Sequence, residues 1–160
     1  MNFITYEIKG WNRFVSGLIA RETTDWIELV YVPQDYMLDG IKFIQKKFIK
    51  YSFYEQDEAF RGKVIQSTKD VGSGTSFSLS NRLFQELVSQ EAVMIELGND
   101  EICYIGKIIK VNRQSLVVRC LSANAEWTYT KNIKKDSIRA ISIQNDYLNT
   151  LIHYVSEKGR

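Results

Sequence analysis

The chain has 160 residues, of which 44% are hydrophobic and 25% charged, the composition of a globular protein with a packed core. Its formal net charge of +2 is too small to indicate nucleic-acid binding by itself, because binding domains usually show a pI above about 9 and a clustered basic face. Nine glycines and one proline argue against long disordered tracts, and two cysteines are too few for a disulfide framework or a cysteine metal site.

The start of the chain does not have the pattern of a secretory signal. Residues 1–7 contain no basic region before an apolar stretch. The longest apolar runs, such as 29–32, are far shorter than the roughly 20 residues that a membrane-spanning helix needs. We therefore expect a cytoplasmic protein with no membrane partner.

The first part of the chain, residues 1–69, predicts a run of short strands and then a helix. Apolar and β-branched residues predict strands at about 2–8, 12–21, 25–32, 40–45 and 48–54. A helix is expected at 57–67, with Asp57 as its N-cap and with Phe60 and Val64 on its buried side.

Residues 70–78 predict a flexible linker, because they are rich in glycine and serine. Residues 79–90 predict a further helix, since Leu79, Leu83 and Leu87 recur every four positions. Ser78 or Ser80 would cap it.

The last part, which together with the extra helix makes a second unit of residues 79–160, repeats the pattern of the first. Its strands are expected at about 92–98, 101–111, 114–121, 126–133 and 137–143. Asn112 and Arg113 read as a tight hairpin turn. A closing helix at 145–156, capped by Asn145, carries one apolar face made of Leu148, Leu151, Ile152 and Val155.

The two units echo each other at a fixed spacing of 89 positions. Glu7 falls on Glu96 and Gly17 on Gly106, and Ile19 and Leu29 fall on Ile108 and Val118 without a gap. A fixed-offset echo indicates a duplicated structural unit. Five short antiparallel strands in each copy are typical of a small β-barrel, so we expect two tandem five-stranded barrels, each followed by a short helix.

Residues 14–19 and 103–108 each place a glycine inside a strand of a bent sheet, and each is followed by a strand like 26–30. This pattern resembles small Sm-like barrels. Residues 104–151 also resemble a set of uncharacterised bacterial cytoplasmic proteins. The Sm-like resemblance implies RNA binding and ring-like self-association as expectations, although two fused copies differ from the usual one-barrel subunit of a ring.

Two matching basic clusters are the first candidate site. They surround corresponding turns and consist of Lys42, Lys46, Lys47 and Lys50 in the first copy and Lys131, Lys134, Lys135 and Arg139 in the second. Exposed lysines attract phosphate, and nearby Phe43, Phe48, Trp127 or Tyr129 would stack on bases. The alternative interpretation is that these are solvated turns whose lysines protect exposed sheet edges.

Aromatic side chains are the second candidate, either as contacts for an extended peptide or as ordinary core. Trp11, Phe48, Trp127 and Tyr129 are the proposed contact residues. Trp11 is expected to be more exposed than Trp26, because it lies in a turn.

The sequence offers no catalytic constellation. His153 is the only histidine, which excludes a two-histidine metal site, and the glycine-rich residues 72–76 lack the ending of a phosphate loop. Cys103 and Cys120, expected on adjacent strands with Ile105 opposite Cys120, are interpreted as small buried residues and not as a redox pair.

We therefore expect a non-catalytic binding protein without metal or cofactor. Its partner would be a protein or peptide, with self-association as one form. The alternative is an RNA or single-stranded nucleic-acid binder that uses the lysine turns.

Overall fold

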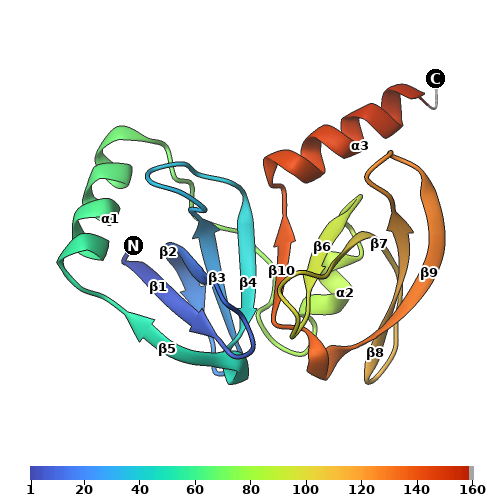
Figure 1. Cartoon of the computed structure of the whole chain (residues 1–160), viewed down its shortest axis with the longest axis horizontal. Helices are drawn as coiled ribbons and strands as arrows, with labels where there is room; N and C mark the ends of the chain where they lie inside the picture. Colours follow the sequence, from blue (N-terminus) through green and yellow to red (C-terminus); the bar gives the residue numbers. More distant parts are fainter. Residues whose placement is uncertain (159–160) are drawn as a thin grey trace.

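Ten antiparallel strands form one continuous sheet in the computed structural model of the chain, which describes residues 1–158 (Figure 1). The strand order is β5-β1-β2-β3-β4-β10-β6-β7-β8-β9. The strands of the first half are β1 (Phe3–Ile8), β2 (Phe14–Glu22), β3 (Trp26–Tyr31), β4 (Ile41–Gln45) and β5 (Ile49–Phe53). Those of the second half are β6 (Val93–Glu96), β7 (Cys103–Val111), β8 (Ser115–Leu121), β9 (Trp127–Lys134) and β10 (Ala140–Ile143). All ten strands that the sequence predicts are therefore present.

The two halves share the same strand order and the same register. Ile4 faces Gly17 between β1 and β2, and 89 positions later Val93 faces Gly106 between β6 and β7. A register shift after Ile19 recurs after Ile108. In a half-buried sheet, register is set by the side chains that each face must bury, so the repeated sequence pattern produces the repeated pairing.

The two glycines of this echo lie where backbone passes unusually close. A Cβ on Gly17 would lie 2.5 Å from the carbonyl oxygen of Val30. On Gly106 it would lie 2.0 Å from that of Arg119. Only glycine allows this approach, which explains the glycine in the middle of each of these two strands.

The expected pair of closed barrels is not what the structure shows, because the sheet stays open. Strand β4 pairs along its second edge with β10 of the other half, from Ile44 opposite Ala140 to Ile41 opposite Ile143. The edge that would close the first half on itself is thereby occupied. The two ends of the sheet, β5 and β9, lie on opposite sides of the molecule (Figure 1).

Helix α1 (Gln56–Thr68) packs on β1 and covers the small core around Phe3 and Leu18. Its buried residues are Gly62 and Ile65, whereas Phe60, expected on the buried side, is exposed. The N-cap is Glu55 and not Asp57, because the Glu55 amide donates to the side chain of Glu58 in a capping box.

Helix α2 is shorter than expected, spanning only Leu83–Leu87 with Arg82 as its N-cap. The predicted leucines Leu79, Leu83 and Leu87 are all buried in the core of the second half. The Oγ of Ser80 still accepts a hydrogen bond from the amide of Arg82. The rest of the predicted helix, residues 79–82 and 88–90, forms turns and bends, and of these residues Leu79 alone is buried.

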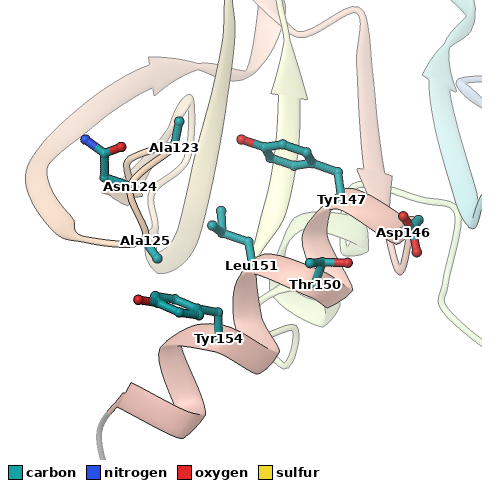
Figure 2. A pocket seen from close by; sticks show the side chains of 8 residues that line it. All are labelled: Ala123, Asn124, Ala125, Asp146, Tyr147, Thr150, Leu151 and Tyr154. Carbon is teal, nitrogen blue, oxygen red and sulfur yellow. The ribbon is translucent and has the colours of Figure 1, made fainter.

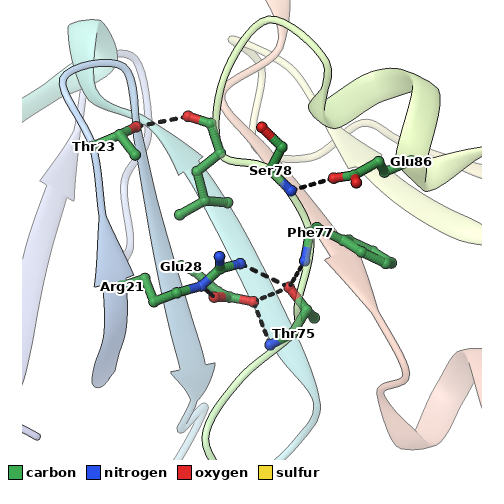
Figure 3. A network of polar contacts seen from close by, with 8 residues as sticks. Arg21, Thr23, Glu28, Thr75, Phe77, Ser78 and Glu86 are labelled. Atoms are coloured by element: carbon green, nitrogen blue, oxygen red, sulfur yellow. Dashed lines mark hydrogen bonds and ion pairs between the residues drawn. The ribbon is translucent and has the colours of Figure 1, made fainter.

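Residues 70–78 lack regular secondary structure, but part of this segment is fastened to the first half (Figure 3). The fully buried carboxylate of Glu28 accepts hydrogen bonds from the amide and hydroxyl of Thr75 and pairs with Arg21 at 2.6 Å. Phe77 stacks on Phe43. The linker prediction therefore describes the composition but not the fixed path of residues 75–77.

Helix α3 (Asp146–Lys158) begins where expected, since the Asn145 side chain accepts a hydrogen bond from the amide of Leu148. Leu148 is its only buried residue among those described. Figure 1 shows this helix rising away from the strands, unlike α1.

Candidate functional site

The two open edges of the sheet, β5 and β9, expose strand backbone that is available to a partner. Tyr51 in β5 and Tyr129 in β9 are 59% and 61% exposed, and Tyr54 follows β5 with a similarly exposed ring. An edge strand presents unpaired amides and carbonyls that pair readily with an extended chain. Sequence analysis identified Tyr129 but missed Tyr51 and Tyr54, because nothing in the sequence says which strand lies at an edge.

The direction of the free amides at the edges follows from the internal joint. The amide of Gln45, at the end of β4, donates to the carbonyl of Arg139 across that joint at 2.9 Å. Successive residues of a strand point their amides to opposite sides, so residues two apart point to the same side. The position 89 residues after Gln45 is Lys134, so Lys134 and Asn132 point their amides out of the sheet at β9.

The internal joint between β4 and β10 encloses a buried ion pair. The Nζ of Lys42 lies 2.8 Å from Glu96, and both side chains are almost fully buried. Arg13 also donates to Glu96, and the Lys42 ammonium lies 4.1 Å from the centre of the Tyr31 ring. Burial lowers the pKa of Lys42, and the charge and hydrogen bond of Glu96 oppose that shift.

Lys42 is therefore removed from the predicted nucleic-acid surface. A buried ammonium already paired with a carboxylate does not reach a phosphate outside. Sequence reasoning grouped it with the turn lysines because it lies four residues before Lys46, whereas strand alternation turns it inward.

The two lysine turns lie in contact with each other. They are short 3-10 helices, η1 (Lys46–Phe48) and η2 (Lys135–Ser137), joined by an ion pair of 2.8 Å between Lys47 and Asp136. The side chain of Gln45 adds a hydrogen bond to the carbonyl of Ile138. The Lys47 hydrogen bond and charge hold the pKa of Asp136 below its ordinary value.

Much of the positive charge at these turns is matched by carboxylates or covered by rings. Lys46 pairs with Glu22 at 2.9 Å, and Lys50 lies 3.6 Å from Glu7. Three further members of the set lie over aromatic rings: Lys131 over Tyr104, Lys135 over Phe84 and Arg139 over Phe48. Lys134 is exposed. Neutralised charges attract phosphate less strongly than free ones.

The predicted aromatic contacts divide into buried and exposed residues. Trp11 is buried, with its indole Nε1 donating to the carbonyl of Leu97 at 2.7 Å, so its turn holds the two halves together and is not a surface. Phe48 and Trp127 are half-buried. Tyr129 is the exposed member of the set.

A groove that the sequence did not predict lies between α3 and the turn linking β8 to β9 (Figure 2). It has a volume of about 570 Å³, and Tyr147, Leu151 and Tyr154 of α3 face Ala123 and Ala125 across it. The spacing of these three α3 residues places them on one helix face. That spacing was the available signal, whereas the apolar face predicted for this helix was Leu148, Leu151, Ile152 and Val155.

The remaining chemical groups form no reactive cluster in the part of the chain described. Within residues 1–158 there is no group of three or more histidine, cysteine or acidic side chains suited to a metal ion. Cys103 is exposed and Cys120 buried, both are free, and Gly106, not Ile105, lies opposite Cys120. None of the helices described is long and apolar enough to cross a bilayer.

Comparison with known proteins returns no significant match, neither to a family model nor to a curated protein nor to a solved structure.

Proposed function

We propose that the protein is a non-catalytic interaction protein that binds another polypeptide as an added strand along an open edge of its sheet. The observation that carries the proposal is the exposed eight-residue strand β9 at one end of the sheet, matched by β5 at the other. Strand addition obtains affinity from backbone hydrogen bonds and specificity from alternate side chains. Tyr51 and Tyr129 supply large contact area beside those backbones.

The same proposal includes the type of structural unit, the location of the protein and the role of the α3 groove. Each half repeats one strand order, which supports two Sm-like units joined edge to edge, and we place the protein in a bacterial cytoplasm. The groove at α3 would take side chains of the same partner, because it lies beside the turn that leads into β9.

Nucleic-acid binding is the second candidate, and the contact between η1 and η2 favours it because both basic turns lie at one place. The carboxylates of Glu22, Asp136 and Glu7 oppose it, since they lie within 4 Å of the lysines that would contact phosphate. We therefore rank it below polypeptide binding.

The test begins with selection of random peptides, displayed on phage, against the immobilised full chain. A synthesised peptide from the selection should protect β9 or β5 amides from hydrogen exchange. Replacing Asn132 by proline, which removes an outward amide, should abolish binding at β9, whereas Asn132→Thr, which keeps the amide, should preserve it. Peptides that bind but leave the amides of both edges unprotected would contradict the proposal.

A parallel titration separates the second candidate. Fluorescence anisotropy of a mixed-sequence single-stranded RNA should show little binding at physiological salt. Tight binding with a steep salt slope, lost in the double variant Lys46→Glu with Lys134→Glu, would favour nucleic acid instead.

A further inference from the structure

We propose that the polypeptide bound at the open edges is a second copy of this chain, with β9 of one molecule pairing antiparallel with β5 of the next. This inference rests on the proposed strand addition and names its partner. The molecule already contains one such joint, because β4 of the first half pairs with β10 of the second.

Each open edge corresponds to one strand of that joint. Strand β9 occupies in the second half the place of β4 in the first, and β5 occupies in the first half the place of β10 in the second. Strand β9 pairs with β8 in the register that β4 keeps with β3: Asn132 opposite Val117 corresponds to Phe43 opposite Glu28. Strand β5 likewise pairs with β1 as β10 pairs with β6. Each molecule thus presents the counterpart of β4 at one end and that of β10 at the other.

The internal joint fixes the register expected between molecules. Phe43 lies opposite Ile141 and Ile44 opposite Ala140 in the internal joint. Carried over by the spacing of 89 residues, Asn132 of one molecule would face Ser52 of the next, and Ile133 would face Tyr51. Both Asn132 and Ser52 are exposed in the single chain.

The buried ion pair of the joint has its counterparts at the two free ends. Lys42 and Glu96 correspond to Lys131 and Glu7. Lys131 lies in β9 and Glu7 lies in β1, next to β5, so one molecule offers the cation and its neighbour the anion. Lysine at an edge often discourages pairing, but here its counterpart forms the ion pair inside the joint.

The turns at the joint repeat the complementarity with reversed sign. Lys47 of η1 pairs with Asp136 of η2 within the chain. The counterpart of Lys47 is Asp136 and that of Asp136 is Lys47, so a contact between molecules would again join a lysine to an aspartate. The amide of Lys134 would likewise reach the carbonyl of Lys50, as the amide of Gln45 reaches that of Arg139.

The two contact surfaces differ from each other, so the assembly is head-to-tail and forms a ring if the rotation closes or a filament if it does not. The edges are more polar than the internal joint, since Asn132 and Ser52 stand where the joint has Phe43 and Ile141. We expect weaker pairing than inside the chain, and hence an association that depends on concentration.

The experiment is sedimentation velocity of the full chain across a concentration series, with two charge-reversed variants, Lys131→Glu and Glu7→Lys. The wild type should exceed the 18.6 kDa of one chain as concentration rises. Each variant alone should associate at least about tenfold more weakly, because like charges would meet at every contact.

An equimolar mixture of the two variants gives the decisive result. Each contact between unlike molecules then joins a lysine to a glutamate, so the mixture should recover the mass of the wild type. A wild type that stays at one chain's mass throughout, or variants that associate as well alone as the wild type, would overturn the inference.

The two proposals fail separately. A chain that remains single while the selected peptide still protects β9 would disprove self-association and leave strand addition standing. Peptide selection without any edge protection would contradict strand addition itself.

Discussion

The two halves of the molecule have the same strand register and yet differ in what covers them. In the first half, α1 lies against β1 and buries Ile65 completely. In the second half, α3 stands away from the sheet, and Tyr154, the counterpart of Ile65, is 56% exposed. The comparison shows that a repeated strand pattern sets the sheet, while a few substitutions decide which surfaces remain free.

The substitutions that separate the helices can be identified. The small core under α1 contains Phe3, Leu18 and Val30. The corresponding positions of the second half hold Ala92, Lys107 and Arg119, respectively. An apolar helix face gains little free energy by packing on lysine and arginine. Helix α3 therefore lacks the apolar sheet surface that α1 covers, and its tyrosines line a groove instead.

The largest difference in stability between matched variants of the two halves should appear at the glutamates that occupy corresponding positions, Glu96 and Glu7. Glu96→Gln leaves Lys42 buried without its anion and should destabilise the protein by about 3–5 kcal/mol. The matched change Glu7→Gln, at a half-exposed position, should alter the free energy of unfolding by less than about 0.5 kcal/mol. Urea denaturation of dilute protein measures both, and equal losses would contradict the comparison.

The two closing helices provide the next contrast. Ile65→Ala removes a fully buried side chain from under α1 and should cost about 2–5 kcal/mol. Tyr154→Ala, at the corresponding position of α3, should change stability by about 0.5 kcal/mol or less. Thermal or urea unfolding followed by circular dichroism tests the pair, and a large loss at Tyr154 would show that α3 is a structural support.

Replacing the matching glycines, Gly17 and Gly106, should destabilise the protein in both cases. Gly17→Ala and Gly106→Ala each push a methyl group against a backbone carbonyl that cannot move aside, so each should cost roughly 1–3 kcal/mol. The closer approach at Gly106 predicts the greater loss there. Unfolding midpoints of the two variants test this, and a neutral change at either position would mean that the close strand crossing is absent in that half.

The smallest effect concerns the pair that joins the two turns. Lys47 holds the Asp136 carboxyl ionised, so its pKa lies below the ordinary 3.8 and its charge is lost only as the pH falls below that value. Lys47→Met should raise the titration midpoint of Asp136 toward 3.8. Carboxyl chemical shifts measured against pH check this, and an unchanged midpoint would show that Lys47 and Asp136 do not pair.

The strands and the echo were predictable because both depend on local pattern. Alternating β-branched and aromatic residues located all ten strands, and the matching glycines gave the offset that the register follows. Helix ends were predicted less well: Phe60 looked like part of a buried face, but α1 packs through Gly62 and Ile65. A glycine in a contact face leaves no hydrophobic signal in the sequence.

The candidate surfaces were less predictable, because they depend on which strands meet. Nothing local reveals that β4 pairs with β10, and this pairing opens the expected barrels and buries Lys42. The same pairing leaves β5 and β9 as edges. Trp11 was misplaced for a related reason, since a turn residue is exposed only if no other part of the chain covers it, and Leu97 does.

Cysteine cross-linking tests the central claim, that the open edges repeat the internal joint, most directly. In a Cys103→Ser background, molecules carrying Ser52→Cys and molecules carrying Asn132→Cys are mixed and oxidised. We expect a disulfide-linked heterodimer from this pair, and little product when Tyr129→Cys, three residues out of register, replaces Asn132→Cys. Equal yields from both pairs, or no heterodimer from the first, would show that the edges do not pair in the register of β4 and β10.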